Sequence, residues 1–130
     1  MATIRKTVHL AAAADAVWAT FADFGAVHTR LAPGFVTATA LEPGGRWVTF
    51  ANGFVAFETL VTMDSAARRL AYAITDSPNL THHSASFEVL PDGDGSRVVW
   101  TADLLPDDAA ERVGAMMEDG CAAMAKALGG

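Results

Sequence analysis

The residue whose type and position best suit chemistry is His83. In the segment 81–90, His83 falls in phase with the apolar side chains of Ala85, Phe87 and Val89. Successive side chains of a strand point to opposite faces, so His83 is predicted to face the interior. An interior imidazole can exchange hydrogen bonds with a ligand or act as a general base near neutral pH. It can equally be a core histidine bonded to a neighbouring side chain or to water.

Glu58 is a second candidate, and its sequence context places it on the outer face. In the segment 54–63, the apolar residues Phe57, Val61 and Met63 alternate away from Glu58. If Glu58 instead faced inward, its carboxylate would need a partner or a proton. Arg46 is the candidate partner, because its strand pairs with this one across the Asn52-Gly53 turn.

Asp103 is a third candidate and lies near the end of the last predicted strand, 96–104. Its face of the strand also carries Val99 and Thr101. The other face is more apolar, so alternation favours burial of Val98, Trp100, Ala102 and Leu104. On this pattern Asp103 meets water; turned inward, it would be an acid close to the final helix.

Patterns typical of metal and cofactor sites are missing from the sequence. His82 and His83 are adjacent on a predicted strand, so they point to opposite faces and cannot both reach one metal ion. His9 and His28 lie on other elements, with no carboxylate at ligand spacing. The single cysteine, Cys121, excludes an internal disulfide and a Cys-based zinc site. We therefore expect neither a metal nor a cofactor.

The composition constrains the partners of the chain. At 130 residues, 52% of them hydrophobic, it has the size of one domain with its own core. A net charge of −6, from 9 Lys and Arg against 15 Asp and Glu, argues against nucleic acid or anionic lipid as a partner. No apolar run approaches the roughly 18 residues of a membrane helix, and the N-terminus reads as a strand rather than a signal peptide. We expect a cytoplasmic protein without stable membrane association, whose partner is a small apolar or neutral molecule.

Hydrophobic periodicity and turn residues predict seven strands and three helices. The strands are expected over 3–10, 35–41, 46–51, 54–63, 68–75, 81–90 and 96–104. A helix that ends at Gly25 and a short helix over 26–32 follow the first strand, and 76–80 is a loop. Asn52-Gly53 is the strongest short signal for a hairpin turn. An antiparallel meander with a long helix across one face is an α+β arrangement, which we assign to a single domain, 1–130.

The long C-terminal helix carries one apolar stripe and ends at Gly129-Gly130. The stripe recurs at helical spacing and consists of Val113, Met117, Cys121, Met124 and Leu128, flanked by Met116 and Gly120. These side chains are expected to face the sheet. They are either ordinary core or the wall of a pocket; methionines adapt to irregular ligands, and Gly120 removes bulk from the inner face.

Three strings of the sequence resemble the START-like superfamily (SRPBCC), which includes polyketide cyclases, the Bet v 1-like birch-pollen allergens and the abscisic acid receptors. They are DAVWATFADFG, NGFVAFETLVTMD with RRLAYAIT, and HHSASFEVLPDGDGSRVVWTADLLP. The resemblance covers nearly the whole chain and implies the helix-grip fold. In that fold a curved seven-stranded antiparallel sheet wraps around a long C-terminal helix, with two short helices after the first strand. The resemblance also implies a cavity between sheet and helix, with loops at 52–54 and 77–80 guarding its mouth.

The resemblance implies which residues line this cavity, and it conflicts with alternation at two strands. It places Glu58 inside and turns Thr101 and Asp103 toward the cavity. Tyr72 matches an inward position of relatives, and His83 matches a cavity tyrosine of the abscisic acid receptors. Following the resemblance, we expect the ligand-binding residues to be Val48, Phe50, Glu58, Tyr72, Ile74, His83, Ala85, Thr101, Asp103, Val113, Met117 and Cys121.

Three functions are compatible with these patterns. The first is binding of a small hydrophobic, lipid-like or aromatic molecule by a monomer or homodimer; the strand FVTATAL lacks the lysine that would meet a carboxylate ligand. The second is a polyketide cyclase or dehydratase-type reaction, in which an inward His83 or Asp103 abstracts a proton next to a carbonyl. The third is an interaction module or dimer built on a convex-face patch of Val55, Phe57, Val61 and Met63.

Overall fold

A computed structural model describes residues 1–75 and 77–129 and shows an antiparallel sheet with helices on one side. The strands are β1 (Ala2–Leu10), β2 (Val36–Glu42), β3 (Gly45–Phe50), β4 (Val55–Asp64), β5 (Arg69–Ile74), β6 (His82–Asp92) and β7 (Gly95–Leu105). The helices are α1 (Ala14–Ala22), the π-helix η1 (Val27–Leu31), the 3-10 turn η2 (Asp107–Ala109) and α2 (Ala110–Leu128). The predicted loop at 76–80 and the predicted helix end at Gly129-Gly130 each include one residue, Asp76 and Gly130, outside the described part of the chain.

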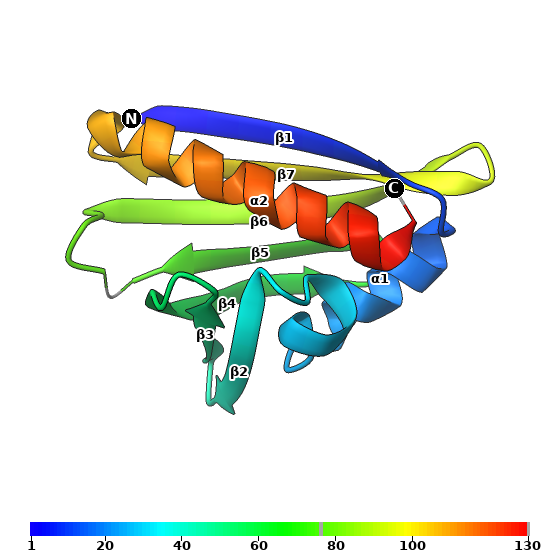
Figure 1. Ribbon diagram of the computed structural model, residues 1–130, viewed down its shortest axis with the longest axis horizontal. Coiled ribbons are helices and arrows are strands. Elements are labelled where there is room, and N and C mark those ends of the chain that lie inside the picture. The colour runs from blue at the N-terminus through cyan, green and yellow to red at the C-terminus, as the bar shows by residue number, and fades with distance from the viewer. Residues whose placement is uncertain (76, 130) are drawn as a thin grey trace.

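The seven strands form one sheet in the order β1-β7-β6-β5-β4-β3-β2, and every neighbouring pair is antiparallel. Figure 1 shows α2 lying across one face of this sheet beside β1 and β7, while α1 and η1 lie near the C-terminal end of α2. This arrangement confirms the predicted helix-grip fold. The face that α2 covers is the concave face, and side chains that point toward α2 are called inward below.

Alternation correctly predicted the inward face of β6. His83, Ala85, Phe87 and Val89 are buried, and the intervening residues are half-buried or exposed. The aromatic ring of Phe87 contacts Phe21 of α1, with ring centroids 4.8 Å apart. This contact ties the first helix to the sheet, so the same alternation that orients His83 also forms part of the core.

A β-bulge in β4 changes which residues of that strand face inward. Glu58 pairs with Ile74, but the register shifts between Leu60 and Thr62, so Val61 is an extra residue with a 63% exposed side chain. A bulged residue reverses the phase of the residues that follow it. Met63 therefore packs against the core rather than sharing a convex face with Val61.

Phe57 and Val61 both lie on the convex face, so Glu58 faces inward and is buried, as the resemblance implied and contrary to the expectation from alternation. The predicted convex patch also loses Met63, and Phe57 packs edge-on against Trp47 at 5.0 Å. Val55 and Val61 remain exposed as separate residues rather than as part of a four-residue patch.

The connection between β3 and β4 is longer than the predicted two-residue hairpin. The strands end at Phe50 and begin again at Val55, so four residues form the loop. Within it the Oδ1 of Asn52 accepts a hydrogen bond from the Phe54 N–H at 2.9 Å, and Gly53 has a φ of +87°. A positive φ of this size favours glycine, and the neighbouring Asn52 and Phe54 both line the cavity described below.

The C-terminal helix begins with a 3-10 turn. Residues 107–109 form the 3-10 turn η2, and the α-helix itself begins at Ala110. Its C-terminal end is fixed by Gly129, which has a φ of +77° and whose carbonyl accepts a 2.7 Å hydrogen bond from the Ala11 N–H. Among the described residues, no helix is long and apolar enough to cross a membrane.

Candidate functional site

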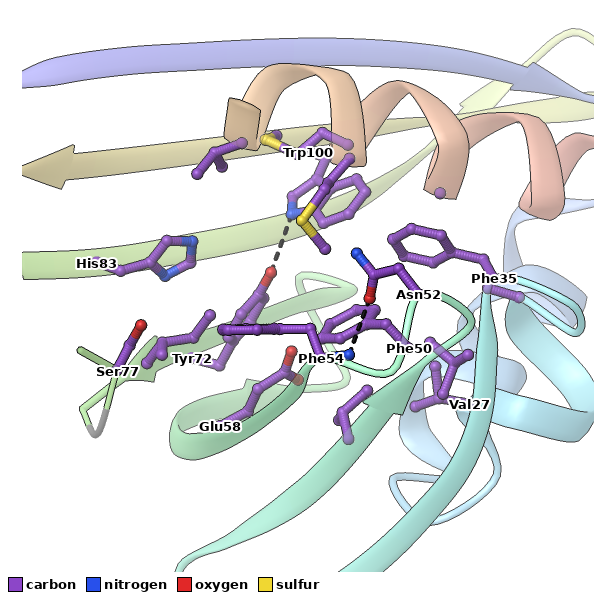
Figure 2. A pocket seen from close by; sticks show the side chains of 18 of the residues that line it. Val27, Phe35, Phe50, Asn52, Phe54, Glu58, Tyr72, Ser77, His83 and Trp100 are labelled. Atoms are coloured by element: carbon purple, nitrogen blue, oxygen red, sulfur yellow. Dashed lines mark hydrogen bonds between the residues drawn. The ribbon is translucent and has the colours of Figure 1, made fainter. Parts of the chain in front are cut away.

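A cavity of about 250 Å³ lies between the concave face of the sheet and α2. Much of its wall is aromatic, from Phe35, Phe50, Phe54, Phe87 and Trp100. Eight of the predicted ligand-binding residues line it: Val48, Phe50, Glu58, Tyr72, Ile74, His83, Val113 and Met117. The space is therefore mostly apolar, with a few polar groups placed among rings (Figure 2).

The other four predicted residues do not line the cavity. Thr101 and Asp103 border a hollow on the opposite face of the sheet, and Asp103 accepts a 2.6 Å hydrogen bond from the Thr3 hydroxyl. Ala85 and Cys121 are buried in the core beside the cavity. Burial, together with the nearby Glu118 carboxylate, raises the pKa of the Cys121 thiol, so this thiol is not activated as a nucleophile.

For β7 the resemblance was wrong and alternation was right. Trp100, Ala102 and Leu104 are the inward residues, so Asp103 must face the convex side. Asp103 and His83 therefore lie on opposite faces of one sheet. They cannot form an acid–base pair around a common ligand.

Glu58 and Arg46 form a buried ion pair in the cavity wall. They are direct cross-strand partners on β4 and β3 and are 6% and 5% exposed. The Nε and Nη2 of Arg46 each lie 2.8 Å from Oε1 of Glu58. The Nη1 of Arg46 donates to the Phe24 carbonyl at 3.0 Å, and the guanidinium lies 4.0 Å from the centre of the Phe24 ring. The predicted partnership is thus confirmed, and the arginine has further contacts that fix its position.

The hydroxyl of Tyr72 is oriented by Trp100. The indole Nε1 of Trp100 donates to the Tyr72 oxygen at 3.1 Å (Figure 2). Burial raises the pKa of Tyr72 far above its ordinary value of 10, and the negative charge of Glu58 adds to this effect. Tyr72 therefore stays a neutral phenol, and because its oxygen already accepts a hydrogen bond, its own O–H can donate to a ligand.

His83 has a polar atom without a partner. The side chain is 6% exposed, and its Nδ1 makes no hydrogen bond within residues 1–75 and 77–129. Burial is the main reason that the pKa of His83 falls from 6.5 to about 4, so the imidazole is neutral at pH 7. Its ring lies 5.8 Å from the Tyr72 ring, centre to centre. Such an unpaired buried group is costly unless a ligand or water completes it.

The two loops that the resemblance implied both border the cavity, and so does the start of α2. Asn52 and Phe54 come from the β3–β4 loop, and Ser77, Asn79 and Leu80 come from the segment before β6. Because Oδ1 of Asn52 accepts from the backbone, its amide nitrogen is turned toward the cavity (Figure 2). Arg112 of α2 also borders the cavity and is exposed to solvent.

Sequence reasoning missed the contact that shapes the centre of the cavity. A Cβ added at Gly120 would lie 2.9 Å from the Trp100 ring and 3.1 Å from the Phe35 ring. Glycine at this position is what lets the indole sit directly beneath the helix. Alternation in the last strand pointed Trp100 inward, and the helical stripe placed Gly120 on the inner face of the helix. The contact between them joins distant parts of the chain and has no local signature.

Metal binding finds no support in the residues that the structure describes. Positions 1–75 and 77–129 contain no group of three His, Cys, Asp or Glu side chains arranged to hold an ion.

A curved antiparallel sheet closed by one long helix over an internal cavity defines the class of helix-grip proteins. The sequence agrees with this fold: the chain belongs to the family described as polyketide cyclase / dehydrase and lipid transport, whose model matches residues 1–129. The START-like resemblance is thereby confirmed. No curated protein is significantly similar in sequence to this chain.

Solved structures agree with the family. A solution NMR structure of a Thermobifida fusca protein shares 32% identity, covers 98% of this chain and 95% of its own, and has a TM-score of 0.74. An uncharacterized Bacillus thuringiensis protein shares 18% identity over 99% of this chain and 100% of its own, with a TM-score of 0.87. A START superfamily protein from Mycobacterium smegmatis shares 16% identity over 97% and 93%, with a TM-score of 0.72. At 18% and 16% identity, the last two likenesses concern the fold alone.

Proposed function

We propose that this protein binds a small hydrophobic or aromatic molecule in the cavity between the sheet and α2. The observation that carries the proposal is the combination of an apolar, ring-lined space of about 250 Å³ with polar groups placed singly in its wall. Natural ligand sites have this composition: mostly apolar surface for affinity, and a few polar groups for orientation. The family description, which names both cyclases and lipid transport, is compatible with it.

The size of the cavity limits the ligand. An engineered apolar cavity of about 150 Å³ binds benzene, so about 250 Å³ suits a molecule of one or two rings, or a short acyl chain. A ligand that buries as much apolar surface as one aromatic side chain, roughly 150–250 Å², gains about 4–6 kcal/mol before the cost of association. Because the cost of association is subtracted from this gain, simple ring compounds are expected to bind no more tightly than tens of micromolar.

An enzymatic role of the cyclase type is the second candidate function, and the position of His83 in the cavity wall supports it. His83 is a buried imidazole inside the cavity, within reach of a bound carbonyl compound. Asp103 on the convex face cannot assist it, and the low pKa of His83 makes it a weak base at pH 7. A His83→Phe variant separates the two functions: retained binding with lost turnover supports the enzyme, and equal loss of both supports a binding pocket.

The direct test of the proposal is to identify what the protein carries. Native mass spectrometry of protein purified from its own host should show a retained small molecule. A thermal-shift panel of one-ring and two-ring compounds should raise the melting temperature of the empty protein by mass action. A protein that carries nothing and is stabilised by no member of the panel would rule out the proposed binding.

A further inference from the structure

Two neutral hydrogen-bonding groups face the same part of the cavity. The imidazole of His83 on β6 and the hydroxyl of Tyr72 on β5 come from neighbouring strands and point into the space beneath α2 (Figure 2). Their rings are 5.8 Å apart, centre to centre. Tyr72 has a donor to give, because its oxygen accepts from Trp100. The His83 ring also borders the cavity, although its own Nδ1 is fully covered and unpartnered. A ligand oxygen between the two side chains can hydrogen-bond to both.

The surroundings of these two groups disfavour an anion. Within residues 1–75 and 77–129, the charges buried near the Tyr72 hydroxyl are Glu58 and Arg46, and these already neutralise each other at 2.8 Å. Of the two, Glu58 acts more strongly on Tyr72 and opposes negative charge on its oxygen. A carboxylate placed at the same point would meet the same repulsion. His83 adds no positive charge near neutral pH, and Arg112 lies at the solvent-exposed rim.

We propose that the ligand is an uncharged molecule with a hydroxyl group on an apolar ring system, and that His83 and Tyr72 hold this hydroxyl between them. The hydroxyl oxygen accepts the Tyr72 O–H, and the hydroxyl also hydrogen-bonds to the ring nitrogen of His83 that is not covered. The result is a chain of hydrogen bonds from Trp100 through Tyr72 and the ligand to His83, in which each bond polarises the next. This assignment rests on the proposed function and names the ligand class within it.

Three probes of equal ring size test the assignment: naphthalene, 2-naphthol and 2-naphthoate. Their dissociation constants are measured at pH 7 from their own fluorescence. Two added hydrogen bonds should make 2-naphthol bind about tenfold more tightly than naphthalene. 2-naphthoate should bind more weakly than 2-naphthol, because its charge loses hydration and finds no free buried cation among the described residues.

Substitutions at the two anchors identify the groups responsible. In His83→Phe and in Tyr72→Phe, each of which removes one of the two hydrogen bonds, the affinity for 2-naphthol should fall by about threefold, while that for naphthalene is kept. His82→Phe is the matched control, because His82 is exposed and is the neighbour of His83 on the same strand. It should retain the full preference for 2-naphthol. Retained naphthalene binding in each variant shows that the cavity is still folded.

A measurement on the unmodified protein tests the same contact without relying on variants that could lose their fold. With ¹⁵N-labelled histidine, the ring-nitrogen resonances of His83 should shift when 2-naphthol is added and stay unchanged with naphthalene. The assignment is overturned if naphthalene and 2-naphthol bind with equal affinity or if 2-naphthoate binds most tightly. It is also overturned if the His83 resonances do not shift when 2-naphthol binds. Failure of all three probes to bind would instead refute the proposed binding function itself.

Discussion

Acidification from pH 7 to pH 5 should weaken the fold by about 2 kcal/mol through His83 alone. His83 is buried without a hydrogen bond to its Nδ1, and its pKa in the folded protein is about 4, against 6.5 for an ordinary histidine. Between these two values the unfolded chain binds a proton that the folded protein does not. Stability from this residue is therefore complete above about pH 6.5 and is lost as the pH falls toward 4.

The size of the effect follows from the two pKa values. A difference of roughly 2.5 units corresponds to about 3 kcal/mol over the whole window, at about 1.4 kcal/mol per unit. Most of this loss, about 2 kcal/mol, falls between pH 7 and pH 5, because the unfolded imidazole is almost fully protonated at pH 5. The aspartates and glutamates of the unfolded chain are still mainly ionised there, so pH 5 isolates the histidines.

Urea unfolding at pH 7 and pH 5 measures this difference for three proteins. The parent chain should lose about 2 kcal/mol more than His83→Phe, in which the titrating group is gone. The His82→Phe control, altered on the exposed neighbour of His83, should behave like the parent. At pH 7 the His83→Phe protein should also be at least as stable as the parent, because it no longer buries an unpartnered nitrogen.

The reasoning would be refuted if His83→Phe kept the same loss of stability between pH 7 and pH 5 as the parent. That result would mean that His83 has an ordinary pKa in the folded protein, through water or a contact that completes its Nδ1.

Three further substitutions probe the cavity wall. Glu58→Leu should destabilise the fold by about 3–5 kcal/mol in urea unfolding, because it leaves the charge of Arg46 buried and unpaired; replacing both residues by apolar ones should recover much of this loss. Tyr72→Phe should cost about 1–3 kcal/mol, because the Trp100 N–H loses its acceptor; an unchanged midpoint would contradict that hydrogen bond. Gly120→Val should weaken 2-naphthol binding by about tenfold or more, because its side chain enters space held by the Trp100 ring; unchanged affinity would place the ligand elsewhere.

Much of the fold was predictable because it follows from local periodicity. Alternation in β6 placed His83 inward, and the 3.6-residue stripe of α2 placed Met117 and Met124 against the sheet. Such patterns depend only on which side of one element is apolar. They hold wherever the element is regular.

The errors arose where an element is irregular or where two distant elements meet. The bulge at Val61 has no clear mark in the sequence. Because of it, Glu58 and Met63 both point toward the core, although five positions separate them on the strand. For Asp103, regular alternation in β7 was a better guide than the general pattern of the family. The proximity of Gly120 to Trp100 depends on how helix and sheet close against each other, which periodicity does not specify.

The methionines of this chain allow one direct test of the central claim that the space beneath α2 receives a ligand. Of the five, Met116, Met117 and Met124 line the cavity, whereas Met1 and Met63 do not. The measurement is a titration of protein carrying ¹³C-labelled methionine methyl groups with 2-naphthol, followed by NMR. The three cavity methyl resonances should shift together and reach saturation while those of Met1 and Met63 stay in place. Cavity methyl resonances that do not move at saturating 2-naphthol, or that move no more than those of Met1 and Met63, would contradict the claim.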